Sequence, residues 1–228
     1  AQLACSYLEA FQITQDRFYA SIARKTLNYV LAHMTSKGGG FLTAQDAESE
    51  PREGEEKREG AFYVWSQPEL VQVLGKEQAA LFSHYYGVEA GGNALSDPHQ
   101  VFVGQNILYA ASLLAATSKK FDRSRDEVAR ELEEARRRLL LVRGRRPRPY
   151  LDDKVLVSWN GLMISAFARA YPIIGDRQYL RAAQQSAHFI LKTLYDEKTG
   201  LLLRRYREGD SHYQAHLADY AFLSMGPV

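Results

Sequence analysis

The strongest constraint on the fold is an internal repeat, in which residues 10–41 align without a gap with residues 170–201. The identical pairs include Ala10/Ala170, Ile13/Ile173, Asp16/Asp176, Arg17/Arg177, Tyr19/Tyr179, Ala23/Ala183, Leu31/Leu191 and Gly40/Gly200. Apolar residues recur at helical spacing in both copies, and Asp16 and Asp176 stand where an N-cap is needed. Each copy therefore predicts two helices joined by a tight turn, then a glycine that ends the second helix, then a short strand.

A third helix pair is predicted between the two copies. Residues 105–117 and 124–142 have helical periodicity, and Ser124 with Glu127 forms a capping box for the second helix. Along that helix, i,i+4 ion pairs predict a solvated charged face: Asp126–Arg130, Glu133–Arg137 and Glu134–Arg138. Before this pair, the sequence predicts a short strand at 61–65 and helices at 66–74 and 77–86.

Helical hairpins in series predict an all-α array in which the chain runs up one helix and down the next. The turns within hairpins are short, around 15–16, 118–123 and 175, whereas the connections between hairpins are long. Up–down geometry places these long connections at one end of the array. We expect the functional site there, because loops on a rigid scaffold carry most sites.

Composition and charge narrow the class of protein. Apolar residues make up 46% of the chain, and the net charge of +2 does not favour nucleic acid or a membrane surface as a partner. The single cysteine, Cys5, excludes an internal disulfide and a cysteine zinc cluster. No apolar run reaches the roughly 18–20 residues that span a bilayer. We expect a cytoplasmic protein, and we expect no metal or cofactor. Because the first residues already read as helix, we also expect a piece of a longer protein.

The first long connection places acidic residues beside aromatic ones. Residues 46–59 include Asp46 and many glutamates, and residues 61–65 bring Tyr63 and Trp65. Two strands around an acidic tip predict a hairpin over the loop-bearing end. Carboxylates accept hydrogen bonds from sugar hydroxyls and rings stack on apolar sugar faces, so a sugar site is one interpretation. A salt-bridged loop with core aromatic residues is the other.

The second long connection enters a helix through the motif DDKVLVSWNG, residues 152–161. Ser158 or Asn160 is expected to cap this helix, whose free N–H groups favour an anion or a sugar oxygen. A plain cap with a packed tryptophan explains the motif equally well. The candidate site residues are Asp152 and Asp153 as catalytic carboxylates, and Trp159 and Asn160 as substrate-binding residues.

Four arginines precede this motif: Arg143, Arg145, Arg146 and Arg148. Prolines rather than aromatic residues interleave them, which favours a solvated or anion-binding loop over a nucleic-acid interface.

The third long connection predicts a strand hairpin before the last helix. Arg205 on one arm is a candidate holder of a hydroxyl or an anion, and His212 and His216 are candidates for proton abstraction. Their i,i+4 spacing does not predict a metal site, because the stretch before His216 does not read as a helix. Asp219 is a further candidate carboxylate and Tyr220 a candidate substrate-binding ring.

Together, several motifs resemble the spermatogenesis-associated protein 20 family over nearly the whole chain: GGGFLTAQDAESE, EGAFYVWS, GQNIL, RPRPYLDDKVLVSWNGLMISAFARA and RRYREG with LADYAFL. The resemblance implies an (α/α)-toroid similar to N-acylglucosamine 2-epimerases and six-hairpin glycosidases. Residues 1–228 would then form a single fragment of a partial toroid with short β-hairpins in its connections. The resemblance also implies a thioredoxin-like N-terminal domain and a remainder of the toroid outside this chain.

Most candidate residues match the family pattern: Asp46, Tyr63, Trp65, Asp152, Asp153, Lys154, Trp159, Asn160, Gly161, Arg205, Asp219 and Tyr220. Gln45, Glu48, His216 and Ala218 depart from it. The pattern has a glutamate at position 218, so any catalytic role of that glutamate would be lost here.

Two functions follow as hypotheses. The first is a carbohydrate-active domain with epimerase or glycosidase chemistry that acts on a small-molecule sugar, by analogy with the fold. The alternative is a non-catalytic binding or scaffold module that holds a peptide or protein for an attached thioredoxin-like domain. A fragment without activity of its own would instead expose apolar helix faces.

Overall fold

The computed structural model describes residues 1–94 and 100–226, most of which lie in helices. The chain forms two compact units, which we describe separately: unit 1 comprises residues 1–45 and 151–228, and unit 2 comprises residues 46–150. In the described part of the chain, no helix has the length and apolar character needed to cross a membrane. The expectation of a mostly helical protein with short β-hairpins is confirmed.

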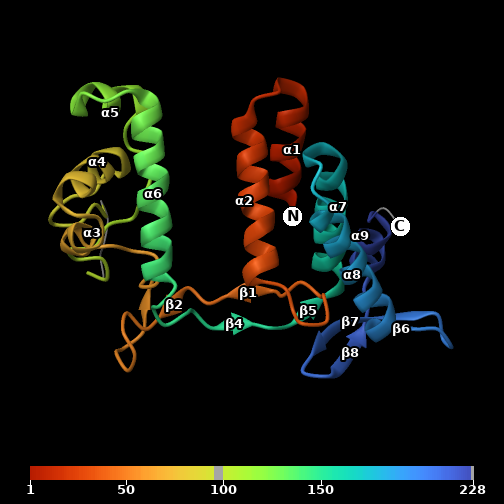
Figure 1. Ribbon diagram of the computed structural model, residues 1–228. Coiled ribbons are helices and arrows are strands. Elements are labelled where there is room, and N and C mark those ends of the chain that lie inside the picture. Colours follow the sequence, from red (N-terminus) through yellow and green to blue (C-terminus); the bar gives the residue numbers. More distant parts are fainter. Residues whose placement is uncertain (95–99, 227–228) are drawn as a thin grey trace. The chain divides into compact units, whose positions relative to one another are not determined.

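Unit 1 contains both copies of the repeat (Figure 1). Helices α1 (Gln2–Thr14) and α2 (Arg17–His33) form the first copy, and α7 (Val157–Ile174) and α8 (Arg177–Leu194) form the second. The turn between the helices falls at equivalent positions in the two copies.

Both predicted N-caps are confirmed. The Asp16 carboxylate accepts a hydrogen bond from the Phe18 N–H at 2.9 Å, and the Asp176 carboxylate accepts one from the Gln178 N–H at 3.0 Å. Local sequence therefore defines where the second helix of each copy begins.

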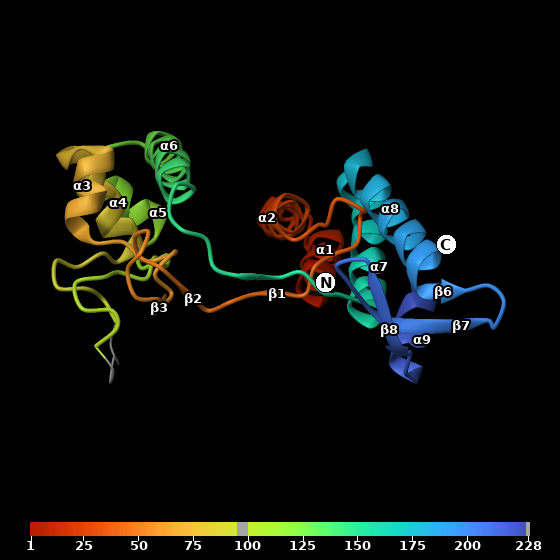
Figure 2. The same cartoon turned by 90° about the horizontal axis from the view of Figure 1, so that it is seen from below.

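Helix α7 packs against α1, α8 and the last helix, α9 (Leu217–Ser224) (Figures 1 and 2). Gly161 permits the close approach of α9, because a Cβ at this position would lie 2.5 Å from the backbone of Phe222. A line of rings crosses the core, with Phe41 stacked on Phe167 at 5.0 Å and Phe167 at 5.8 Å from Tyr179. Helix α7 is thus the centre of unit 1.

Short antiparallel strands join the connections of unit 1 at the end where α2 finishes and α7 begins. Strand β1 (Ala44–Gln45) pairs with β4 (Leu151–Asp152). Strand β7 (Leu201–Arg207) pairs with β5 (Val155–Leu156), β6 (Tyr195–Asp196) and β8 (Asp210–Gln214). The predicted hairpin of the third connection, β7–β8, is confirmed.

Unit 2 contains four short or medium helices among its described residues: α3 (Gln67–Leu74), α4 (Lys76–Tyr86), α5 (Leu114–Phe121) and α6 (Arg125–Arg143). The capping boxes predicted at Ser66–Glu69 and Ser124–Glu127 are both present. The apolar face of α6 packs on α3 and α4 through Val128, Leu132, Ala135 and Leu139.

The prediction of a helix over residues 105–117 is wrong at its start, because α5 begins only at Leu114. The reason is Asn106, whose side chain is fully buried. Its amide donates to the carbonyls of Trp65 and Glu89 and accepts from the Glu89 N–H. These long-range bonds hold residues 105–107 in an extended conformation, so the helix cannot begin there.

The strand predicted at residues 61–65 is also wrong. Residues 60–63 form turns, and the hairpin around the acidic tip is built instead by β2 (Glu48–Ser49) and β3 (Arg58–Glu59). The Arg146 guanidinium accounts for the turn, because it donates to the carbonyls of Phe62 at 3.0 Å and Val64 at 2.7 Å.

The glycines expected to end the second helices do not do so. Helix α2 ends at His33 and α8 at Leu194, both well before Gly38 and Gly200. Gly38 and Gly40 instead flank the Phe189 ring, where an added Cβ would lie 2.7–2.8 Å from ring atoms. Gly200, with a φ of +69°, lies in the turn between β6 and β7.

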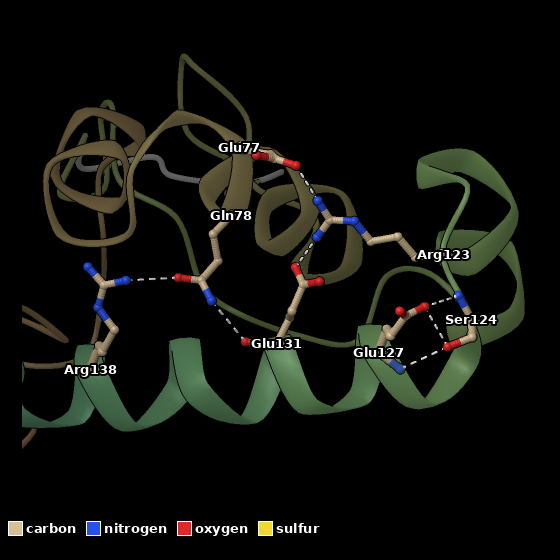
Figure 3. Close-up of polar contacts among 7 residues, drawn as sticks. All are labelled: Glu77, Gln78, Arg123, Ser124, Glu127, Glu131 and Arg138. Carbon is tan, nitrogen blue, oxygen red and sulfur yellow. Dashed lines mark hydrogen bonds and ion pairs between the residues drawn. The ribbon is translucent and has the colours of Figure 1, made fainter.

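The charged face of α6 is less solvated than predicted (Figure 3). The Glu133–Arg137 pair forms at 3.5 Å, but Arg138 donates to Gln78 of α4 at 3.0 Å. Arg123 bridges Glu131 of α6 and Glu77 of α4. Part of the charge run therefore fastens α6 to its neighbours.

Candidate functional site

The first turn of α7 borders a hollow of about 430 Å³ in unit 1, which we call the Trp159 hollow. Apolar side chains form most of its lining: Val30, Met34, Phe41, Leu42, Leu162 and Met163. The Trp159 indole also lines it and remains 53% exposed, which is unusual for the largest apolar side chain. Gln2, Thr43 and Asn160 supply its polar groups.

Asn160 is buried beneath this hollow and holds its wall together. Its Oδ1 accepts from the Phe41 N–H at 2.7 Å and from the Ser186 hydroxyl at 3.1 Å. Its Nδ2 donates to the carbonyls of Phe41 and Leu156, each at 2.9 Å. Since these bonds use both amide hydrogens and the carbonyl oxygen, Asn160 shapes the site rather than offering a ligand free hydrogen bonds.

The cap of α7 comes from outside the motif, which corrects the expectation that Ser158 or Asn160 would provide it. The carboxylate of Asp219, 1% exposed, accepts from the Ser158 N–H at 3.0 Å through one oxygen. Its other oxygen accepts from the His216 N–H at 2.9 Å. Asp219 thus stabilises the N-termini of α7 and α9 together.

Asp152 and Asp153 both form ion pairs on the strand side of the motif. Lys154 lies 2.6 Å from Asp152, and its hydrogen bond holds the pKa of the Asp152 carboxyl below its usual value. Arg207 of β7 lies 2.8 Å from Asp153. A carboxylate with a lowered pKa is a poor general acid near neutral pH, so this geometry does not favour a proton-donating role for Asp152.

The β7–β8 hairpin carries two of the predicted residues, Arg205 and His212, and the third, His216, follows it at the N-cap of α9. Asp210 lies 3.5 Å from Arg205 and 3.3 Å from His212, and Arg205 also lies over the ring of Tyr213. Arg204 donates to the His216 ring at 2.9 Å. The hairpin therefore presents a linked polar surface, with His212 more than half exposed.

Tyr220, at the start of α9, is partly engaged by the backbone. Its hydroxyl accepts a hydrogen bond from the Leu202 N–H at 2.9 Å, and the ring is 39% exposed.

The remaining predicted residues lie in unit 2. Trp65 is 2% exposed, and the Arg146 guanidinium stacks on its ring at 4.1 Å. Tyr63 is 42% exposed beneath Arg143, and Asp46 is exposed with its carboxylate 3.4 Å from the Glu48 N–H. Trp65 therefore belongs to the core of unit 2, in line with the alternative that the aromatic residues of this connection are core residues.

Sequence reasoning missed the apolar lining of the Trp159 hollow. Met34, Phe41 and Met163 read as ordinary core positions, because their spacing does not distinguish a closed core from the wall of a hollow. The available signal for an unusual backbone path was the run of three glycines, Gly38–Gly40, directly before Phe41. Among the described residues, there is no cluster of three or more His, Cys, Asp or Glu that could hold a metal ion.

Comparison with known proteins identifies relatives over almost the whole chain. It is 35% identical to human spermatogenesis-associated protein 20 over 245 aligned residues, 33% identical to the mouse protein and 32% identical to the rat protein. Each alignment covers 99% of this chain and 31% of the relative, so the chain spans about a third of the length of the curated relatives it matches. No family model matches the chain. The relationship expected from the sequence motifs is confirmed.

Proposed function

Because this chain is a relative of the spermatogenesis-associated protein 20 family, whose name specifies no chemistry, we propose its function from its own site: a binding module for polypeptide. Unit 1 would hold an apolar side chain of a peptide or protein in the Trp159 hollow. The observation that carries the proposal is an exposed indole beside a hollow lined by two methionines, Met34 and Met163. Methionine-lined apolar surfaces adapt to varied apolar side chains.

The state of the candidate carboxylates supports binding over catalysis. Asp152 and Asp153 are neutralised by Lys154 and Arg207, and Asp219 is buried as a double cap. A glycosidase needs two carboxyl groups that face one substrate, one of them with a raised pKa. The ion pairs and the cap described here work against that requirement.

A carbohydrate ligand is the second candidate, and the exposed Trp159 favours it, because indole rings stack on the apolar faces of sugars. Sugar hydroxyls, however, need several hydrogen-bonding partners. Asn160 is saturated by protein bonds and the Thr43 hydroxyl donates to the Lys154 carbonyl at 2.5 Å. An apolar side chain therefore fits the hollow better than a sugar ring.

We propose in addition that α1–α2 and α7–α8, followed by α9, are hairpins of an α/α toroid, with a thioredoxin-like domain elsewhere in the longer protein. The packing of α7 against both α1 and α9 supports this arrangement, because these helices would be neighbours in the inner ring. The module would then present bound polypeptide to the redox domain.

The test compares two ligand panels on a Trp65→Phe variant, in which Trp159 is the remaining tryptophan of the chain. One panel contains capped Gly/Ser hexapeptides with a single Leu, Met or Phe, and the other contains hexoses, N-acetylhexosamines, uronates and disaccharides. We expect peptides to change Trp159 fluorescence and to raise the melting temperature, since a ligand of the native state stabilises it.

Trp159→Ala in the wild-type chain should abolish the rise in melting temperature, whereas Phe18→Ala, which removes another exposed ring of unit 1, should preserve it. A response to sugars alone would replace the peptide proposal with the carbohydrate one. No response to either panel would refute the hollow as a ligand site.

A further inference from the structure

Unit 2 contains a separate surface that the proposed function does not use. Two hollows, of about 500 Å³ and 550 Å³, share Val142 and Arg145 at the end of α6 as lining residues. Arg138 and Leu141 extend the first hollow, and Arg52 and Pro147 extend the second. We call this pair of hollows the arginine groove.

The groove lies in the most basic stretch of the chain. Residues 135–151 contain seven arginines and no acidic residue. Arg145 is exposed at the centre of the groove, and Arg138 and Arg52 are exposed on its rim. Burial lowers the pKa of the Arg146 guanidinium, and the Glu69 carboxylate 3.4 Å away opposes that shift.

Two carboxylates also line the groove, and one of them is already committed. Glu69 accepts hydrogen bonds from the Ser66 N–H at 2.8 Å and lies 3.4 Å from Arg146. Glu53 lies in the acidic tip beside Arg52. The arginines outnumber these carboxylates, so the groove retains a field that attracts negative charge.

The groove also exposes apolar surface. Leu141 is 71% exposed and the adjacent Leu140 is 57% exposed, at the end of a helix whose other leucines are buried. Val142, Val73 and Trp65 line the hollow of about 500 Å³. An occupant that matches this surface carries both carboxylates and an apolar anchor.

Nucleic acid matches the surface less well. The rings of Phe62, Tyr63 and Trp65 lie beneath the guanidinium groups of Arg143, Arg146 and Arg148, at 4.1–5.8 Å. Rings covered in this way cannot stack on bases, which is the usual source of affinity for single strands.

We propose that the arginine groove of unit 2 docks an acidic polypeptide segment that carries a leucine-like anchor. Arg145 pairs with its carboxylates, while Arg138, which also donates to Gln78, and Arg52, 3.9 Å from Glu55, add positive charge on the rim. The anchor rests against Leu141 and Val142. This inference is independent of the Trp159 hollow, because it concerns different residues in the other unit.

The experiment measures fluorescence anisotropy of labelled probes with the 228-residue chain. The probes are a Glu-rich peptide with two leucines, the same peptide with serines in place of leucines, a Lys-rich peptide with two leucines, and an oligouridine. We expect the Glu/Leu peptide to bind tightest and its affinity to fall as salt rises, because the contacts are ionic.

Two charge-reversal variants distinguish binding in the groove from attraction of the peptide by the net charge of the chain. Arg145→Glu should lower the affinity for the Glu/Leu peptide by about tenfold or more, since it removes a central ion pair and adds repulsion. Arg130→Glu changes the net charge equally at an exposed position outside the groove, and should weaken binding less than about twofold. Leu141→Ser should lower the affinity for the Glu/Leu peptide but not the affinity for the Glu/Ser peptide.

Circular dichroism and a thermal melt check that the variants fold. If Arg145→Glu does not fold, Arg145→Gln takes its place in the binding measurement. Equal losses for Arg130→Glu and Arg145→Glu would overturn the proposal, because net charge would explain both. Tighter binding of oligouridine would reassign the groove to nucleic acid, and no binding of any probe would also overturn it.

Discussion

The two copies of the repeat share a local pattern but differ in how deeply they are buried. In the first copy, Tyr19 of α2 is partly exposed, whereas its counterpart Tyr179 of α8 is completely buried. Helix α1 buries Ala4 and Leu8, whereas α7 buries residues along most of its length. Helix α7 has neighbours on several sides, namely α1, α8 and α9. Position in the array, rather than the repeated sequence, therefore decides how much each copy contributes to stability.

The largest expected loss of stability concerns the equivalent tyrosines of the two copies, Tyr19 and Tyr179. Tyr179→Ala leaves a cavity beside Phe167 and removes the hydrogen bond from the Tyr179 hydroxyl to Asn28, and should lower the free energy of unfolding by about 3–5 kcal/mol. Tyr19→Ala should cost about 1 kcal/mol, because its site is already partly open to water. Urea denaturation of both variants measures the difference, and equal losses would contradict the unequal burial of the two copies.

A smaller effect concerns the cap that α7 receives from another helix. Asp219→Ala leaves the buried N–H of Ser158 and the part-buried N–H of His216 without their acceptor, and should destabilise the chain by about 2–3 kcal/mol. Asp16→Ala in the first copy removes a single exposed cap and should cost about 1 kcal/mol. Thermal melts rank the two variants, and a larger loss at Asp16 would argue against a structural role for Asp219.

The smallest expected change in stability concerns the turn between the two helices of each copy. Gln15 and Gly175 are equivalent residues, and both adopt a left-handed backbone, with φ of +57° and +83°. Gly175→Gln should cost about 1 kcal/mol, because a side chain disfavours this conformation even in open space. Gln15→Gly should be neutral or slightly stabilising, since it relieves the same conformational cost. Calorimetry of both exchanges checks the signs, and a stabilising Gly175→Gln would contradict the argument.

The helices that local signals specify could be predicted from the sequence. Asp16, Asp176, Ser66 and Ser124 each bond to the backbone within three residues, so their effect does not depend on the rest of the fold. The error at residues 105–113 has the opposite cause. Asn106 bonds to Trp65 and Glu89, which are distant in sequence, and such partners leave no local pattern.

The candidate site shows the same division. The DDKVLVSWNG motif was identified as a helix entry with an unusual polar content, and this holds. The roles within it were not readable, because Asn160 bonds to Phe41 and Ser158 to Asp219 across large sequence separations. A polar residue that binds a ligand and one that ties two segments together look alike in sequence.

The sequence by itself determined the two repeated hairpins, their caps, the mostly helical class and the family relationship. These depend on periodicity and on contacts within one or two helical turns, which any window of the chain contains. Only the tertiary structure decided that α7 is central, that Asp219 caps it, and that Trp159 stays exposed beside a hollow while Trp65 is buried. Burial and long-range hydrogen bonds arise when distant segments meet, and side chains of one type then take different roles.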